Sequence, residues 1–360
     1  MGALSMRDAL ASFAGKRVFI TGHTGFKGSW MTFLLKEVGA DVMGYAFAPE
    51  PGPSHFELLK LAPRIHHIVG DIADAAGLKK ALLDFQPEYV FHLAAQALVK
   101  RSYQDPVGTF QANVMGSVHL LEAVRHCASV RSLVYITSDK CYENVEWVWG
   151  YRENDRLGGR DPYSASKGAA EVVFSAYARS YLQDPDGLGA ASTRAGNVIG
   201  GGDWAADRII PDCIRAIEAG MPIVLRNPKA TRPWQHVLEP LSGYVLLAAN
   251  LHARPQAFDS AWNFGPSSIE VRTVEDVARA IVASLGRGSI QVEQPAHVQH
   301  EAQLLQLNCD KAHQQLGWSP RWPVDKTLDA TAHWYAAYLG GKDVEEVTRA
   351  QIHDYFPELP

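Results

Sequence analysis

The sequence predicts an α/β protein with a doubly wound parallel sheet and a smaller, interleaved C-terminal α/β lobe. Residues 16–21 form a short apolar run typical of a buried strand, and glycines at positions 22, 25 and 28 separate it from a helix-compatible segment. Strand-like and helix-like segments then alternate at regular intervals, as they do in parallel sheets with right-handed crossovers. Beyond residue 200 the alternation becomes irregular, which indicates a second lobe.

The glycine turn at residues 22–28 is a candidate phosphate site. Glycines let backbone N–H groups approach a phosphate, and the N-terminus of the following helix attracts its charge. The spacing Gly-x-x-Gly-x-x-Gly departs by one residue from the common dinucleotide fingerprint, and without its flanking strand and helix it would indicate only a surface turn. The side chains at positions 23 and 27 are expected either to contact a pyrophosphate or to be solvated. The candidate cofactor-binding residues here are Gly22, His23, Gly25, Phe26, Lys27 and Gly28.

The other strands of the predicted sheet are short apolar runs, expected at residues 41–47, 64–71, 89–93 and 132–138. Neither an acid nor an arginine occupies positions 45–48, where such a residue would contact the adenosine ribose, so the sequence leaves both NAD and NADP open. Asp71 is expected either to cap a turn or to bind the adenine amine. Small residues after the fourth strand leave room for a flat ligand. Further cofactor candidates are Ile72, Leu93, Ala94 and Ala95.

The C-terminal region predicts a lobe that interleaves with the first. We expect residues 1–195 to form the cofactor-binding domain and residues 196–360 to form mainly the substrate lobe, with some segments returning to the first domain. Residues 273–285 are expected to be helical, and residues 334–356 are expected to form one or two solvated helices.

Composition excludes several classes of protein. The 360 residues are 47% hydrophobic and 20% charged, which is ordinary for a globular protein, and the net charge of −5 does not favour nucleic acid as a partner. The four cysteines are far apart and the histidines lack metal-ligand spacing, so neither a disulfide framework nor a metal site is expected. No apolar run reaches the length of a membrane span and no signal peptide is evident. We therefore expect a cytoplasmic protein.

Tyr163 and Lys167 are the sharpest candidate catalytic pair. Four residues apart on a helix, they share a face, so the ammonium is expected to lie close to the phenol and to lower its pKa. A free tyrosine is a poor base at neutral pH because its pKa is about 10. At the end of the fifth strand, Ser138, Asp139 and Lys140 place a carboxylate beside an ammonium, which could serve as acid and base or form only a solvated ion pair.

Taken together, these residues resemble the extended short-chain dehydrogenase/reductase family over nearly the whole chain. The resemblance implies a Rossmann-type fold with NAD as cofactor. Its shorter motifs are Thr-Gly-x-x-Gly-x-x-Gly at residues 21–28, Asp71-Ile72, His-Leu-Ala-Ala at residues 92–95, Asn113 and Tyr163-x-x-x-Lys167. Longer and more specific strings lie at residues 22–28, 138–144, 194–204 and 226–237.

These longer strings are similar to those of nucleotide-sugar 4,6-dehydratases, and they imply CDP-glucose as the substrate. In the implied reaction Tyr163 takes the proton of the sugar 4-hydroxyl as NAD oxidises C4, water is eliminated across C5 and C6, and hydride returns to C6. Ser138 would bind the reacting hydroxyl, Asp139 would be the acid that helps the 6-hydroxyl leave, and Asn113 would support the helix behind the site.

Lys140 departs from the family pattern, because related dehydratases carry Asp-Glu where this chain has Asp139-Lys140. For Lys140 to remove the C5 proton, its pKa must be depressed well below about 10.4 by burial or by nearby positive charge. It could instead bind the developing enolate or hold the cofactor.

The family pattern also assigns binding residues and partners. It points to Asn197, Arg208 and Arg232 for the substrate diphosphate, and the planar fork of arginine suits phosphate oxygens. The resemblance implies a homodimer built on the helices at residues 106–127 and 163–181, and a role in lipopolysaccharide sugar supply.

Three other functions are compatible with parts of the pattern. A 4-epimerase would need the tyrosine and lysine but no acid and base at C5 and C6. A non-catalytic dinucleotide sensor could dispense with the catalytic pair. A steroid-type oxidoreductase would need an apolar pocket in place of the arginines.

Overall fold

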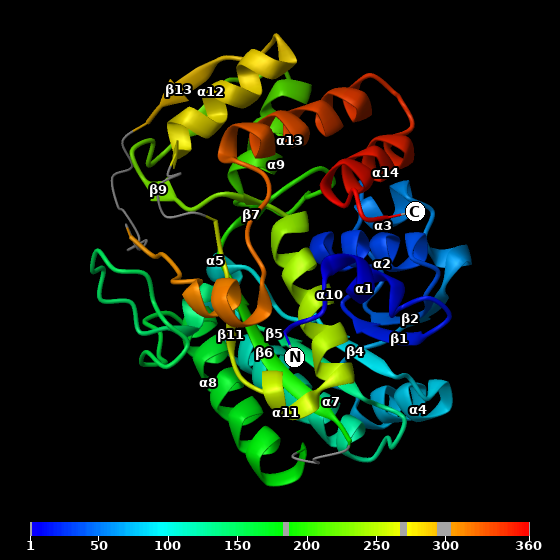
Figure 1. Ribbon diagram of the computed structural model, residues 1–360. Coiled ribbons are helices and arrows are strands. Elements are labelled where there is room, and N and C mark those ends of the chain that lie inside the picture. Colours follow the sequence, from blue (N-terminus) through cyan, green and yellow to red (C-terminus); the bar gives the residue numbers. More distant parts are fainter. Residues whose placement is uncertain (1, 183–186, 267–271, 294–303, 360) are drawn as a thin grey trace.

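The computed structural model describes residues 2–182, 187–266, 272–293 and 304–359. Its centre is a seven-stranded sheet in which all neighbouring strands are parallel (Figure 1). The strand order is β11 (Trp262–Phe264), β6 (Gly189–Ala195), β5 (Ser132–Ile136), β4 (Tyr89–His92), β1 (Arg17–Thr21), β2 (Asp41–Ala46) and β3 (His66–Val69). The predicted α/β fold and its first five strands are confirmed, and β6 and β11 complete the sheet.

Helices cover both faces of this sheet, because successive side chains of β1 point to opposite faces and both faces are apolar. Phe19 joins the apolar cluster under α4 (Ala75–Phe85), α7 (Gly116–Arg125) and α8 (Pro162–Tyr177), whereas Val18 and Ile20 join the cluster on the opposite face. That second cluster packs under α1 (Met6–Ala11), α2 (Phe26–Glu37) and α10 (Leu238–Ala253). Burial on both faces explains why the strands read as continuous apolar runs.

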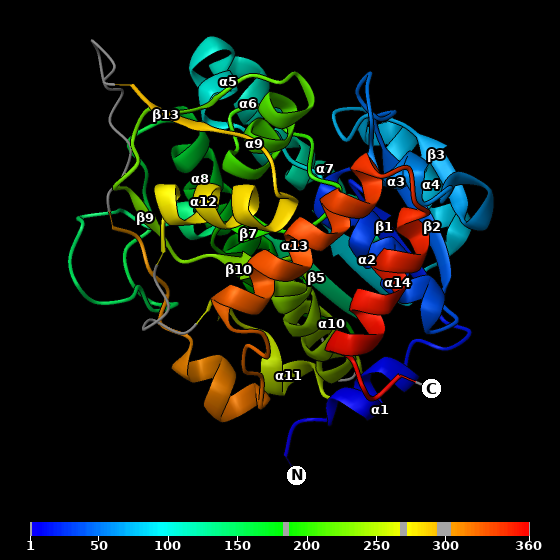
Figure 2. The same cartoon turned by 90° about the horizontal axis from the view of Figure 1, so that it is seen from above.

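The remaining elements are short or belong to the C-terminal half. The helices are α3 (His55–Leu58), α5 (Val99–Gln104), α6 (Pro106–Phe110), α9 (Ile209–Glu218), α11 (Pro255–Phe258), α12 (Val274–Leu285), α13 (Val324–Leu339) and α14 (Val344–Tyr355). The short strands pair as β7 (Val198–Ile199) with β10 (Gln235–His236), β8 (Ile223–Leu225) with β13 (Ile290–Val292), and β9 (Thr231–Arg232) with β12 (Arg272–Thr273). Helices α12 and α13 lie side by side, beyond one end of the central strands (Figure 1 and Figure 2).

The two closing helices, α13 and α14, correct one prediction. Residues 334–356 do form helices, but the expectation that they are solvated is wrong, because Trp334, Tyr335 and Ile352 are fully buried. Trp334 lies where a Cβ on Gly201 would fall, and the Tyr335 hydroxyl donates to the carbonyl of Asp203 at 2.5 Å. The C-terminal helices therefore hold the glycine-rich loop at residues 200–202 in place.

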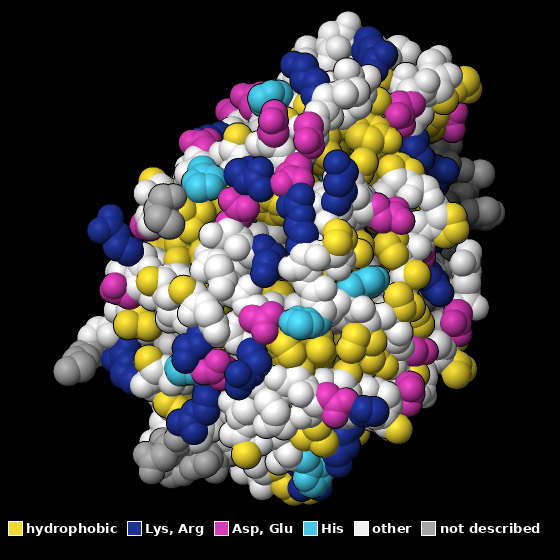
Figure 3. Space-filling model, turned by 90° about the vertical axis from the view of Figure 1, so that its right-hand side faces the viewer, with side chains coloured by type: hydrophobic (Ala, Val, Ile, Leu, Met, Phe, Trp, Pro, Cys, Tyr) yellow, Lys and Arg dark blue, Asp and Glu magenta, His cyan; other side chains and the backbone are white. Residues whose placement is uncertain are grey.

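The face on the β3 side of the molecule mixes Lys and Arg with Asp and Glu (Figure 3). Ion pairs such as Arg64–Glu345 at 2.6 Å and Arg349–Glu37 at 3.1 Å explain part of this mixture. Within the described ranges, no helix is both long and apolar enough to cross a membrane.

Candidate active site

The glycine turn joins β1 to α2 in a conformation that only glycine allows. Gly22 has a φ of 76°, and a Cβ there would lie 2.7 Å from the amide of Ala94. A Cβ on Gly28 would lie 2.0 Å from the carbonyl oxygen of Gly22, so this glycine permits close packing of α2 on the turn. Gly25 is exposed at the N-cap of α2, and no side chain of the described residues caps that helix. Its first amides are thus available to a phosphate, and the turn fits the pyrophosphate of a dinucleotide.

His23 turns its ring into the protein. Its Nε2 lies 2.7 Å from Nδ1 of His67 on β3, and the ring packs edge-on against Phe56. Burial, together with the neighbouring His67, lowers the pKa of His23 to about 3. The alternative that this side chain is solvated is therefore wrong. Contact between His23 and a cofactor stays a prediction.

The Lys27 side chain lies near a group of charged residues, and His23 is not among them. Burial lowers the pKa of Lys27 to about 8, and the charges of Arg208, Asp139 and Lys167 all act on it. The ammonium lies 6.0 Å from the centroid of the Tyr244 ring on α10. The Lys27 side chain is half-buried, and its charge interacts with that of the candidate catalytic carboxylate. Contact between Lys27 and a pyrophosphate stays a prediction.

The remaining cofactor candidates follow β3 and β4. An oxygen of Asp71 accepts the amide of Ala73 at 2.8 Å, so the capping role is present, and binding of adenine stays a prediction. Ile72 packs where a Cβ on Gly116 would fall. Leu93, Ala94 and Ala95 continue from β4 beside the glycine turn.

Ser138 and Asp139 form a buried polar pair directly after β5. The Ser138 hydroxyl donates to the carboxylate of Asp139 at 2.8 Å and accepts the amide of Lys140 at 3.3 Å, at the start of a 3-10 turn over Asp139–Cys141. Burial raises the pKa of Asp139, although Lys140, Ser138 and Lys27 work against this shift. A carboxyl group with a raised pKa is suited to donate a proton. Lys140 is half-buried.

Tyr163 and Lys167 lie together near the start of α8, as predicted. Pro162 and the Asp161 side chain begin this helix, and the amide of Tyr163 donates to Ser102 at 3.1 Å. The ammonium of Lys167 lies 5.9 Å from the centroid of the Tyr163 ring.

The predicted effect on the pKa of Tyr163 is wrong. Burial of the phenol raises this pKa to about 12, outweighing the hydrogen bond from Ser138 and the charge of Arg208 that lower it. Burial likewise lowers the pKa of Lys167 to about 8, while Cys141 and Glu171 raise it. Desolvation therefore dominates both members of the pair.

The substrate candidates lie after β6, at the start of α9 and on β9. Arg208 pairs with Asp203 at 2.9 Å, and its charge acts on Tyr163 and Lys27. Asn197 follows Gly196 in the sequence and Arg232 precedes Pro233. Both Gly196 and Pro233 line a small pocket beside Asp139. The residues lining this pocket beside Asp139 include Gly196, Pro233, Gly265, Pro266 and Leu307.

Behind the site, Asn113 lies in the π-helical segment Gln111–Met115. It donates to Ser166 of α8 at 2.9 Å and exchanges two hydrogen bonds with the backbone of Gln96, which confirms its supporting position. Sequence patterns did not identify Glu171, a buried carboxylate one turn after Lys167, although a carboxylate four residues after this candidate catalytic lysine shares its helix face.

Comparison with known proteins agrees with this geometry. Residues 19–331 match the family model described as GDP-mannose 4,6 dehydratase. The chain is 48% identical over 345 residues to a CDP-glucose 4,6-dehydratase of Salmonella typhimurium, covering 95% of this chain and 96% of that protein. It is 27% identical to a dTDP-glucose 4,6-dehydratase of Xanthomonas campestris, covering 88% of this chain and 92% of that protein.

Solved structures show the same fold. A UDP-glucose 4-epimerase of Thermus thermophilus in complex with NAD superposes with a TM-score of 0.74 at 26% identity, covering 89% of this chain and 98% of that one. A dTDP-glucose 4,6-dehydratase of Streptomyces venezuelae gives a TM-score of 0.76 at 24% identity over 91% of this chain and 99% of that one. The chain belongs to the GDP-mannose 4,6 dehydratase family of extended short-chain dehydrogenases/reductases.

Proposed function

We propose that this protein is an NAD-dependent hydro-lyase that converts CDP-glucose to CDP-4-dehydro-6-deoxyglucose and water. The observation that carries the proposal is the buried Asp139 carboxyl group, whose pKa is raised by burial, beside Ser138 and Tyr163. The 48% identity to a CDP-glucose 4,6-dehydratase supports the choice of substrate. A protonated acid beside a tyrosine and a lysine suits elimination after oxidation.

NAD, when bound, accepts a hydride from C4 of the sugar and returns it to C6. The turn from Gly22 to Gly28 would hold its pyrophosphate, and Asp71 with residues 93–95 would lie against the rest of the cofactor. In our proposal residues 1–195 form this cofactor domain and residues 196–360 mainly bind the nucleotide sugar.

The catalytic residues act in two stages. Tyr163 takes the proton of the sugar 4-hydroxyl, Ser138 positions that hydroxyl, and the charge of Arg208 favours the phenolate. The resulting 4-ketone acidifies the hydrogen on C5, and Lys140 takes this proton as the double bond between C5 and C6 forms. Asp139 then protonates the departing 6-hydroxyl. Asn197, Arg208 and Arg232 hold the diphosphate.

The test is incubation of CDP-glucose with the protein and NAD in deuterated water, followed by mass spectrometry and by NADH absorbance. We expect a product lighter by one water, carrying one solvent deuterium, with no lasting NADH. An epimer of unchanged mass would identify a 4-epimerase, and stoichiometric NADH would identify a simple dehydrogenase. NAD binding without turnover would favour a sensor.

Replacing Lys27 with Met tests what this lysine does. Because its charge lowers the pKa of Asp139, removing it is expected to move the limb of the pH profile that reports ionisation of Asp139 to higher pH, since the acid then stays protonated to higher pH. NAD affinity should change less than about threefold if the ammonium acts on Asp139 and not on the pyrophosphate. Lys36→Met, at the far end of α2, is the matched control. Weaker NAD binding with an unmoved limb would contradict this role.

We also propose a homodimer formed by the helices around α6 and α8. These helices contact each other and carry exposed apolar side chains. The exposed residues are Tyr103, Val107, Phe110, Met115, Val172 and Tyr181. A cytoplasmic location is part of the same proposal, because all four cysteines are free and buried.

Val107→Asp combined with Val172→Asp should convert the dimer to a monomer, because it places charge on this surface. Light scattering coupled to size exclusion measures the mass. Val148→Asp alters a similarly exposed valine on the loop between β5 and α8, outside the helices of the proposed interface, and the variant should keep the mass of a dimer. A wild-type monomer, or a double variant that stays dimeric, would overturn this interface.

A further inference from the structure

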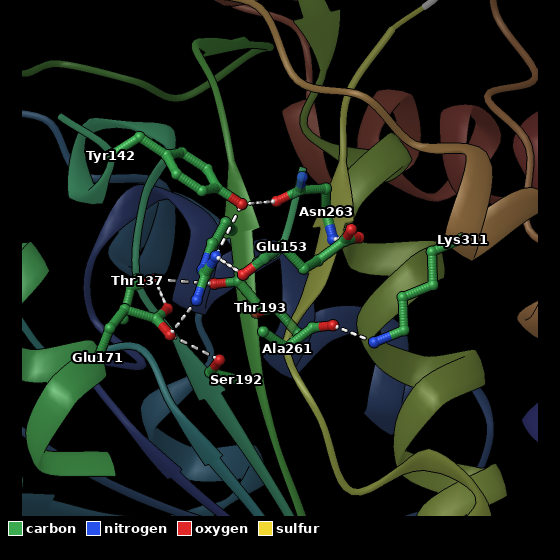
Figure 4. A network of polar contacts seen from close by, with 10 residues as sticks. Thr137, Tyr142, Glu153, Glu171, Ser192, Thr193, Ala261, Asn263 and Lys311 are labelled. Atoms are coloured by element: carbon green, nitrogen blue, oxygen red, sulfur yellow. Dashed lines mark hydrogen bonds and ion pairs between the residues drawn. The ribbon is translucent and has the colours of Figure 1, made fainter. Parts of the chain in front are cut away.

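Glu171 is a buried carboxylate on the catalytic helix that the roles above do not use. It lies on α8, one turn after Lys167 and two turns after Tyr163, and only 2% of it is exposed. Three side chains donate to it (Figure 4): Thr137 to one oxygen, and Ser192 and Arg194 to the other, each of these two at 2.8 Å. A single carboxylate thus joins α8 to β5 and β6.

The bond from Thr137 fixes the point where the catalytic residues leave the sheet. Thr137 is the last residue before Ser138 and Asp139. Its amide donates to the carbonyl of Thr193 at 2.8 Å, and its hydroxyl reaches Glu171 and the same carbonyl. The two halves of the catalytic site, one on the β5 terminus and one on α8, are therefore linked through Glu171.

Arg194 extends the link to the chain that follows the catalytic turn. Its Nη1 donates to the Tyr142 hydroxyl at 2.7 Å and to the carbonyl of Glu153 at 2.9 Å. The Tyr142 hydroxyl in turn donates to Asn263 of β11 at 2.8 Å. As Figure 4 shows, the Glu171 carboxylate extends from its helix toward Thr137 and Ser192.

A buried ion pair is a poor choice for stability alone. Desolvating both charges costs free energy that their attraction repays only when the remaining hydrogen bonds are satisfied, and apolar replacements are often as stable. Such pairs are best known for fixing one arrangement of packed elements. Here the arrangement that is fixed is the one between Ser138–Asp139 and Tyr163–Lys167.

We propose that Glu171 is a positioning residue of this enzyme, holding the end of β5 and the catalytic face of α8 in the one alignment that brings the acid and the tyrosine to the same substrate. The proposal rests on the proposed dehydratase function. Thr137 transmits this alignment, whereas Ser192 only completes the solvation of the carboxylate.

The sharpest test compares Thr137→Val with Ser192→Ala. Each removes one hydroxyl donor from Glu171 and leaves the ion pair with Arg194 intact, but only the first releases the residue beside Ser138. Thr137→Val is expected to lower kcat about 30-fold with KM for CDP-glucose changed less than about twofold, because misplaced groups lose rate more than binding. Ser192→Ala should lose less than about threefold. Equal kcat values for the two variants would overturn the proposal.

A second measurement separates a positioning role from general destabilisation. The groups that interact electrostatically with Lys167 are Glu171 on its own helix, Cys141, Lys27 of α2 and His92 of β4. Because Glu171 raises the pKa of Lys167, Glu171→Gln should move the alkaline limb that reports loss of this ammonium to lower pH. Glu239→Gln removes another buried carboxylate, bonded to Tyr355 and Trp322, and should leave the limb in place. An unmoved limb in a folded Glu171→Gln variant would contradict the role.

Hydrogen exchange decides the inference even if the proposed substrate is wrong. Wild-type protein that releases no product from CDP-glucose would refute the proposed function alone. Amides of residues 138–142 should still exchange about tenfold faster in Thr137→Val than in Ser192→Ala. The same exchange rates in both variants would refute the positioning role.

Discussion

Replacing Tyr163 with Phe is expected to lower kcat for dehydration about 10³-fold, because the ring keeps its volume but can no longer accept the proton of the 4-hydroxyl. The hydroxyl is buried beside Ser138 and Asp139, so water is a poor substitute for it. Oxidation at C4 precedes elimination in the proposed reaction. The variant should therefore also fail to form NADH transiently or to exchange the C5 hydrogen with solvent.

Tyr89→Phe provides the matched control for this substitution. Tyr89 is equally buried in the sheet, but it lies at the start of β4, and its hydroxyl makes one long contact of 3.4 Å to Ser12. The kcat of the Tyr89→Phe variant should stay within about twofold of the wild-type value. Solvent deuterium appearing at C5 in the Tyr163→Phe variant at the wild-type rate would show that another group takes the proton.

Acid is expected to destabilise the protein steeply, because four buried histidines resist protonation. Burial lowers the pKa values of His23, His55, His92 and His236 to about 3 in the folded protein. Below pH 6.5 the unfolded chain binds protons that the folded chain does not, so the free energy of unfolding falls with pH. Between pH 7.5 and 5.5 each histidine costs about 1.4 kcal/mol, and the four together cost about 5.5 kcal/mol.

Urea unfolding at the two pH values measures this loss. His236→Gln removes one titrating ring while keeping a side-chain acceptor near the amide of Leu238. The variant should lose about one quarter less free energy between the two pH values, whatever its absolute stability. Asp139 and Glu239, whose pKa values are raised by burial, act in the opposite direction at lower pH. Equal unfolding midpoints at both pH values would contradict the prediction.

The sequence identifies the features that depend on local spacing. The glycines at 22 and 28 are dictated by close backbone contacts within one turn, and Tyr163 and Lys167 share a helix face by their spacing alone. The parallel sheet follows from the regular alternation of elements. These are short-range properties, and the fold and the catalytic face could be predicted from them.

Features that depend on distant contacts could not be found this way. The ring of His23 meets His67, and the polar-looking closing helices bury Trp334 and Tyr335 against the loop at residues 200–204. Residue spacing also carries no information about desolvation, and for this reason the pKa of Tyr163 is raised where the sequence predicts that it is lowered. Glu171 draws its partners from the end of β5 and from β6, so its importance emerges only once these strands and α8 are assembled.

The edge strand β11 gives the protein a particular order of assembly on the ribosome. β6 ends at Ala195, but its partner β11 ends at Phe264, roughly 70 residues later. At about 5–20 residues per second, the outer edge of β6 waits about 3–14 s after its own synthesis before β11 can pair with it. An unpaired edge is a template for association with other chains. Translation pauses between these two strands should therefore increase the aggregated fraction of newly made protein, whereas pauses after Phe264 should not.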